Sequence, residues 1–318
     1  MNKYFPALTG LRALAAYLVF VQHFNFFKEW SGFSFIASVV DECYIGVSIF
    51  FVIIGLLTYT HYSARTGIAR NFWRNYLKKR ARRAYPIYFI LTTVTFAAAI
   101  YLGSTGYSTT ENSLLYLFNL TLLQGFFDNF KYSGIIQGWT LTVAECFYLS
   151  APLLFVFFRP GYSWLSLVLY GLVAGAVLVL FIGKIHLLGL FGSYQFTFVY
   201  TIFGRLFEFL TGVYIGRYCR RIRKNPIKGI SHTLAGAAWI VACLYLLSLV
   251  KSIFHVQQGI FHPVGILINN FILPIGIAVF VYGLIVESNW FSKLLTFTRV
   301  ADRRFVGSLG DADRESGN

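Results

Sequence analysis

The sequence contains little charge. Only 12% of its 318 residues are Asp, Glu, Lys or Arg, and only 12 residues are acidic. Soluble domains carry about 25% charged residues, so this composition excludes an ordinary soluble protein. Apolar residues make up 57% of the chain, in recurring runs of about 20 residues, the length that crosses a lipid bilayer. The composition therefore predicts an all-α, polytopic integral membrane protein.

Signatures of metal, redox and nucleotide-phosphate chemistry are also absent from the sequence. The four cysteines show no CxxC spacing, so we expect them to be buried packing residues. No zinc signature or glycine-rich phosphate loop occurs. The histidines apart from His23 show no spacing typical of metal ligands. We therefore expect no metal site.

Positive charge is abundant by comparison, and it gathers in two segments. Of 27 Lys and Arg residues, eight lie between Arg65 and Arg83 and six between Arg217 and Lys228. Cytoplasmic loops of membrane proteins are enriched in these residues. We therefore expect both segments and the N-terminus to be cytoplasmic, with residues 28–43 and 251–263 facing outward. Anionic membrane lipids or a phosphate-bearing cofactor, not nucleic acid, are the expected partners of this charge.

Apolar runs between the charged loops predict 8 to 10 transmembrane helices. Eight runs are long enough to span, at residues 8–28, 44–62, 84–103, 138–158, 162–183, 200–217, 231–250 and 264–287. Two weaker segments, 113–127 and 186–199, leave the count open. Because both basic loops must lie on one side, either both weak segments cross the membrane or neither does.

The two ends of the chain and the first basic segment carry further expectations. The first run contains Arg12 and lacks a cleavage site, so we expect a retained span, not a signal peptide. Aromatic and basic residues alternate over 65–83, which is typical of a helix lying in the membrane interface. Residues 291–318 are polar and predict a tail that is either disordered or truncated.

Two ionisable residues share one face of the first span. Arg12 and His23 are eleven residues apart, which leaves an angle of about 20° on a helix and a separation of roughly 16 Å along its axis. Ionisable groups in a membrane usually face protein or a water-filled cavity. Arginine suits phosphate binding and histidine suits proton transfer. The plainer alternative is that Arg12 reaches the lipid headgroups and His23 bonds a backbone carbonyl.

Glu145 lies inside another apolar run, GWTLTVAECFY, and a buried carboxylate needs a partner. It can orient His23, as the acid does in a Ser-His-Asp triad. With eight spans Glu145 lies in the same half of the bilayer as His23, whereas with ten it lies nearer Arg12. The alternative is a purely structural ion pair with another helix.

Further polar positions have mainly structural interpretations. In RLFEFLTGVYIG, the residues Arg205, Glu208, Gly212 and Gly216 share one helical face, which predicts an internal ion pair beside a close helix contact. Ser48 can be read as a nucleophile. A helix-packing hydroxyl is the favoured interpretation, because no nucleophile elbow surrounds it.

Five segments together resemble the membrane-bound acyltransferase 3 family, from residue 5 to about 287. They are LTGLRALAAYLVFVQHF, GVSIFFVIIGLL, RARRAYPIYF, GWTLTVAECFY and RLFEFLTG, in the family's order. The resemblance implies an acyltransferase domain over residues 5–290. It also implies transfer of an acyl group, usually acetyl, from cytoplasmic acyl-CoA to a carbohydrate hydroxyl. Acceptors of such enzymes include O-antigen, peptidoglycan and exopolysaccharide, and the expected location is the bacterial inner membrane.

The resemblance also implies roles for individual residues. Arg12, Arg80 and Arg83 would bind the phosphates of acyl-CoA. His23 would be catalytic, as a general base or a transient acyl carrier, together with Glu145. Residues in supporting roles would be Ser48, Trp139, Tyr148, Arg205 and Glu208.

The chain departs from the family pattern in three places. Thr9 replaces the usual aspartate, Ile54 replaces the usual serine, and the further apolar pair that usually follows is not found. These departures keep a truncated, inactive acyltransferase open as an alternative. A proton-coupled transporter or glycolipid flippase is a second alternative, because such proteins also need intramembrane Arg, His and Glu. The lack of an internal repeat argues against it.

Overall fold

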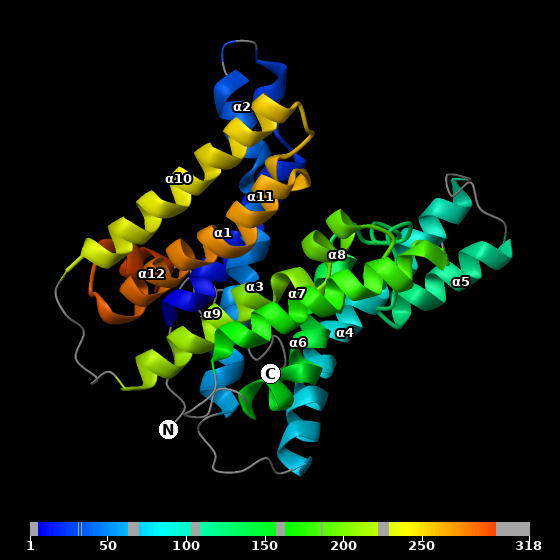
Figure 1. Cartoon of the computed structure of the whole chain (residues 1–318), viewed down its shortest axis with the longest axis horizontal. Coiled ribbons are helices and arrows are strands. Elements are labelled where there is room, and N and C mark those ends of the chain that lie inside the picture. Colours follow the sequence, from blue (N-terminus) through cyan, green and yellow to red (C-terminus); the bar gives the residue numbers. More distant parts are fainter. Residues whose placement is uncertain are drawn as a thin grey trace, which may run out of the picture. The chain divides into compact units, whose positions relative to one another are not determined.

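The computed structural model describes residues 6–30, 32, 34–62, 70–102, 109–156, 163–185, 187–221 and 229–296. Over these residues the chain is helical and has no named strand, with one isolated bridge between Phe127 and Leu190 (Figure 1). The predicted all-α class is confirmed there. The chain divides into two compact units, Met1–Ala64 with Glu208–Asn318, and Arg65–Phe207.

The first unit contains the two ends of the chain. Its helices are α1 (Pro6–His23), α2 (Ser34–Asp41), α3 (Gly46–Tyr62), the later part of α9 (Ile202–Arg221), α10 (Ser231–Phe254), α11 (Pro263–Leu267) and α12 (Leu273–Val286). Helix α10 packs along α12, and α1 packs along α3. A π-helical turn, Ile268–Ile272, joins α11 to α12.

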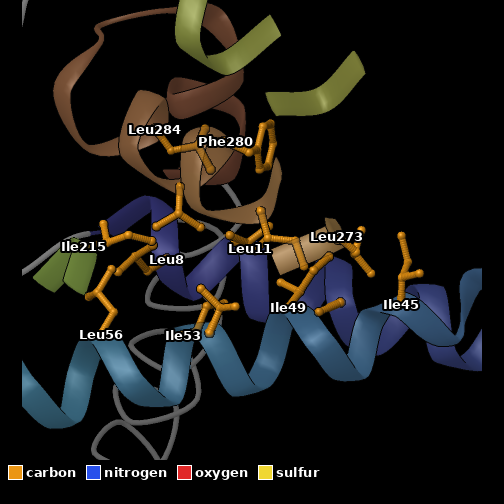
Figure 2. Packing of buried hydrophobic residues seen from close by; sticks show 14 of the residues in the cluster. Leu8, Leu11, Ile45, Ile49, Ile53, Leu56, Ile215, Leu273, Phe280 and Leu284 are labelled. Atoms are coloured by element: carbon orange, nitrogen blue, oxygen red, sulfur yellow. The ribbon is translucent and has the colours of Figure 1, made fainter. Parts of the chain in front are cut away.

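Apolar residues at helical spacing build the core of this unit. Leu8, Leu11, Ala15 and Val19 form a buried stripe along α1, as expected for apolar residues three or four positions apart. Figure 2 shows Leu8 and Leu11 of α1 among isoleucines of α3 and residues of α12. Lipid tails are as apolar as these side chains. The contact is therefore stabilised by close packing and not by the exclusion of water.

Helices α3 and α9 approach each other through glycines. A Cβ atom on Gly212 would lie 1.9 Å from the carbonyl oxygen of Val52, and one on Gly55 would lie 2.0 Å from that of Phe209. Neither position has room for any other side chain. This confirms the predicted close helix contact at Gly212.

Acidic residues connect the loops of the first unit. Asp41 accepts hydrogen bonds from Lys28 at 2.8 Å and Lys251 at 2.5 Å, and Glu42 accepts one from the backbone N–H of Gly259 at 2.8 Å. The segments 28–43 and 251–263 therefore meet at one end of the unit. This agrees with the prediction that both lie on the same side of the membrane.

Glu287 binds the N-terminal end of α10, opposite the end near Lys251. Its carboxylate accepts the backbone N–H groups of His232 and Thr233 at 2.8 and 3.1 Å and the Thr233 hydroxyl at 2.7 Å. Burial raises the pKa of this carboxyl, but the hydrogen bonds outweigh burial and bring its pKa down to about 2. Glu287 thus caps the start of α10 from the end of α12.

The second unit consists of α4 (Arg70–Tyr101), α5 (Thr109–Leu120), α6 (Gly138–Val156), α7 (Trp164–Phe181), α8 (Tyr194–Tyr200) and the start of α9. Helix α5 runs back along α4: the hydroxyl of Tyr88 donates to the carbonyl of Asn119 at 3.1 Å, and Thr93 and Tyr116 share a bond of 2.9 Å. The basic residues from Arg70 onward belong to α4 itself, so the described part of 65–83 continues directly into a span.

Seven segments of the described residues are long and apolar enough to cross a membrane, at 7–29, 34–61, 73–101, 164–185, 194–219, 231–254 and 263–286. The chain is therefore a multi-pass membrane protein. The predicted run 138–158 forms α6 but is not among the seven. The weak segments form the short helices α5 and α8, about 18 and 10 Å long, against a hydrocarbon thickness of about 30 Å. The total of 8 to 10 and the cytoplasmic N-terminus stay predictions.

The predicted boundary at residue 290 falls at the start of a short helical stretch, 290–296. Leu295 is buried there, and its carbonyl oxygen lies 2.2 Å from where a Cβ on Gly10 would be. This part of the predicted tail therefore packs against α1. Residues 297–318 lie outside the described residues.

Candidate functional site

His23 is the last residue of α1, and its ring is fixed by the helix. Its Nδ1 lies 2.8 Å from the carbonyl oxygen of Val19. A carbonyl can only accept, so Nδ1 carries the proton, and in the neutral ring Nε2 keeps its lone pair. The backbone bond that we considered as the plainer interpretation of His23 is therefore present. The same bond selects the tautomer that a general base acting through Nε2 requires.

Arg12 and His23 lie on the same edge of the packed face of α1. Arg12 follows the buried Leu8 by four residues, and His23 follows the buried Val19 by four. Side chains four positions apart lie one above the other on a helix. Arg12 is half-buried and His23 is exposed. The helix is continuous between them, which confirms the predicted common face.

Ser48 and Glu208 meet in the interior of the first unit, between α3 and α9. The hydroxyl of Ser48 donates to Oε1 of Glu208 at 2.8 Å, and both residues are fully buried. This geometry fits the favoured interpretation of Ser48 as a hydroxyl that holds two helices together.

Two asparagines extend this polar cluster. The Ser48 hydroxyl lies 3.5 Å from Oδ1 of Asn269, whose Nδ2 donates to Oδ1 of Asn270 at 2.9 Å. Both amides are buried in the π-helical turn, and such turns are frequent at functional sites. Sequence reasoning missed these residues. The available signal was a pair of amides inside the apolar run ILINNFILP, where polar groups are costly.

In the second unit, Arg80 on α4 faces α6. Its guanidinium donates to the hydroxyl of Tyr148 and also lies over that ring, 4.2 Å from the ring centre. The Tyr76 ring lies 5.3 Å away on the same helix. Arginine over an aromatic face is a favourable cation–π arrangement. The structure thus brings together Arg80 and Tyr148, two of the predicted site residues.

Arg80 is also a charged neighbour of Glu145, and its positive charge offsets part of the cost of burying that carboxylate. The structure thus places a positive charge near Glu145 within the second unit, and an ion pair between them stays a prediction. A pairing of Glu145 with His23, which lies in the first unit, stays a prediction.

Glu145 lines a cavity of about 360 Å³ bounded by α4, α6 and the turn that follows α5. The hydroxyls in its wall are directed into the protein. Tyr85 donates to the carbonyl of Leu120, and Thr142 donates to that of Leu122. The surface that remains is largely apolar.

The other predicted residues of this unit have supporting contacts. Trp139 is buried edge-on against Tyr200, with ring centres 4.9 Å apart. Arg205 is fully buried, and its Nε donates to the carbonyl of Val199 at 2.7 Å. A pairing of Arg205 with Glu208 stays a prediction. The backbone of Arg83 belongs to α4, but its side chain lies outside the described residues. Among the side chains that are described, no group of three or more His, Cys, Asp or Glu could hold a metal ion.

Comparison with known proteins finds relatives that match this chain over about half of its length. The chain is 26% identical to a candidate O-acetyltransferase of Staphylococcus aureus over an alignment of 166 residues that covers 48% of this chain and 25% of that protein. It is 27% identical to the peptidoglycan O-acetyltransferase OatA of Listeria monocytogenes over an alignment of 164 residues that covers 48% of this chain and 24% of OatA. It is 28% identical to a candidate peptidoglycan O-acetyltransferase of Bacillus subtilis, YrhL, over 49% of this chain and 24% of YrhL.

The chain therefore matches about a quarter of the length of these relatives. No solved structure matches it significantly. A family model for the acyltransferase domain, in contrast, matches residues 5–303. This stretch contains every residue described in this subsection and nearly all of the chain. The protein belongs to the acyltransferase 3 family of membrane acyltransferases.

Proposed function

We propose that this protein moves an acetyl group from cytoplasmic acyl-CoA to a hydroxyl of a carbohydrate at the outer face of the bacterial inner membrane. The observation that carries the proposal is on α1, where one helix edge presents Arg12 and His23, and where Nδ1 of His23 lies 2.8 Å from the carbonyl oxygen of Val19. The names of the relatives point to peptidoglycan as one acceptor. Acyl-CoA is a substrate in this account, not a resident cofactor.

His23 would act as the general base. As the acceptor oxygen attacks the thioester carbonyl, Nε2 takes the hydroxyl proton. The carbon–sulfur bond then breaks, and the CoA thiolate leaves and takes the proton from Nε2, which restores the neutral ring. The alternative, in which Nε2 itself carries the acyl group between donor and acceptor, uses the same lone pair.

The phosphates of the donor would be bound by arginines. Arginine forms two parallel hydrogen bonds to phosphate, and Arg12, Arg80 and Arg83 are the candidates. Arg80 is pre-oriented by Tyr148, so less side-chain entropy is lost when it binds an anion. Glu145 would keep Arg80 in place.

The test is acetyl transfer by membranes that contain the protein. Membranes with and without it receive radiolabelled acetyl-CoA and peptidoglycan fragments, and ester-linked label that is released by mild base is counted. We expect base-labile label only with the protein. The transporter alternative predicts instead that glycan or glycolipid crosses sealed vesicles without acetylation, and the inactive-enzyme alternative predicts neither result.

A further inference from the structure

His23 lies at the end of a helix, where packing contributes least to holding the chain. The buried stripe of α1 ends at Val19, and no residue from 20 to 30, all of which the structure describes, is buried. Helix ends also fray, because no further turn supports their last hydrogen bonds. The ring of His23 is bonded to Val19 across this same last turn. Its direction therefore depends on what holds the chain just after it.

Asn25, two residues after His23, is bonded to α2. Its Nδ2 donates to the carbonyl oxygen of Ala37 at 2.8 Å and to Oδ1 of Asp41 at 2.9 Å. A carbonyl and a carboxylate can only accept, so the amide nitrogen of Asn25 must face both, and its side chain has one orientation. These two bonds fix the chain after α1 against the last turn of α2.

Asp41 connects this contact to a further helix. Its side chain is 9% exposed and also accepts hydrogen bonds from Lys28 and Lys251 at 2.8 and 2.5 Å. Lys251 belongs to α10, which packs against α2 (Figure 1). Lys28 lies in the 3-10 turn Phe26–Glu29, directly after Asn25. Because the buried carboxylate is paired with two positive charges, it is a fixed partner for the amide of Asn25.

We propose that Asn25 is a positioning residue for His23 and that Asp41 anchors it. The inference rests on the proposed acyl transfer. Asn25 acts through the end of α1, which it holds so that Nε2 of His23 keeps one direction toward the acceptor hydroxyl. Catalysis is sensitive to such placement, because an error of about 1 Å can lower the rate about 100-fold.

The activity test uses Asn25→Ala, which removes both bonds of the amide and leaves the two lysines on Asp41. We expect kcat for acetyl transfer to fall about 10–100-fold, with the KM for acetyl-CoA within about twofold of wild type. Asparagine carries no charge, so the pH profile of kcat should keep its position. A merely structural role would instead lower the amount of folded protein and leave its kcat unchanged. Asn129→Ala, at an exposed asparagine of the second unit, is the matched control and should keep the wild-type kcat.

A second measurement does not depend on turnover. Diethyl pyrocarbonate modifies unprotonated histidine nitrogens, and mass spectrometry gives the rate at each histidine of the folded protein in detergent. His61 is the internal reference, because it is exposed and its Nδ1 makes the same bond to its own helix, at 2.7 Å. We expect the ratio of the His23 rate to the His61 rate to rise in Asn25→Ala, because a loosened last turn exposes Nδ1 of His23. The ratio should stay at its wild-type value in Asn129→Ala.

A wild-type kcat in Asn25→Ala, a higher KM with unchanged kcat, a displaced pH profile, or an unchanged ratio of modification rates would overturn the inference. Absence of acetyl transfer by the wild-type protein would instead contradict the proposed function. The ratio of modification rates would then still decide whether Asn25 holds His23 in place.

Discussion

Glu287 shows how one residue links two helices through its charge. Its folded pKa of about 2 lies below the ordinary value of 4.5, so its contribution to stability is complete above pH 4.5 and is lost as the pH falls towards 2. We expect Glu287→Gln to lower the free energy of unfolding by about 2–3 kcal/mol at pH 7. The difference from wild type should shrink as the pH falls from 4.5 towards 2.

Thermal unfolding in detergent between pH 7 and pH 3 checks this prediction. Glu29→Gln is the matched control, because Glu29 is exposed at the end of a short 3-10 helix and should leave the Tm nearly unchanged. Identical Tm values for wild type and Glu287→Gln at pH 7 would contradict the role of Glu287 as a cap of α10.

At the scale of elements, the contact of α3 with α9 depends on the absence of side chains. Gly212→Ala places a Cβ 1.9 Å from the carbonyl of Val52, so the two backbones must separate. We expect a loss of about 1–3 kcal/mol or more, seen as a lower Tm and less folded protein on size-exclusion chromatography. Gly32→Ala is the control, because no atom lies within 4 Å of its Cβ position. Equal behaviour of the two variants would contradict the close approach.

Individual helices were also the features that could be predicted best from the sequence. A membrane requires every spanning backbone to satisfy its own hydrogen bonds, so a long apolar run in a membrane protein forms a helix. The α1 face could be predicted from spacing alone. The weak segments 113–127 and 186–199 could not be assigned. Their helices α5 and α8 are too short to be recognised as spans by length, and they pack against neighbouring helices that a single sequence does not reveal.

Contacts between distant segments could not be predicted from the sequence. Arg80 meets Tyr148 only because α6 packs against α4 in the right register, 68 residues later. Likewise, the Ser48–Glu208 bond joins residues 160 positions apart. A single sequence shows that such groups need partners, but not which partners they have.

At the scale of the whole molecule, the orientation in the membrane is testable. Segment 28–43 is expected outside, and the basic start of α4 inside. We expect a cysteine at Gly32 to react with a membrane-impermeant maleimide added to intact cells, and a cysteine at Lys78 to react only after lysis. The native cysteines are buried or half-buried, so the unmodified protein gives the background. The reverse labelling pattern would contradict a cytoplasmic N-terminus.

The central claim is that His23 performs the chemistry, and acetyl transfer by His23→Ala tests it most directly. His61→Ala is a matched control, because Nδ1 of His61 makes the same bond to its own helix, 2.7 Å from the carbonyl of Leu57. At equal protein levels, we expect His23→Ala to lose about 10²–10⁴-fold in kcat and His61→Ala to stay within twofold of wild type. Acetyl transfer by His23→Ala at the wild-type rate would contradict the account.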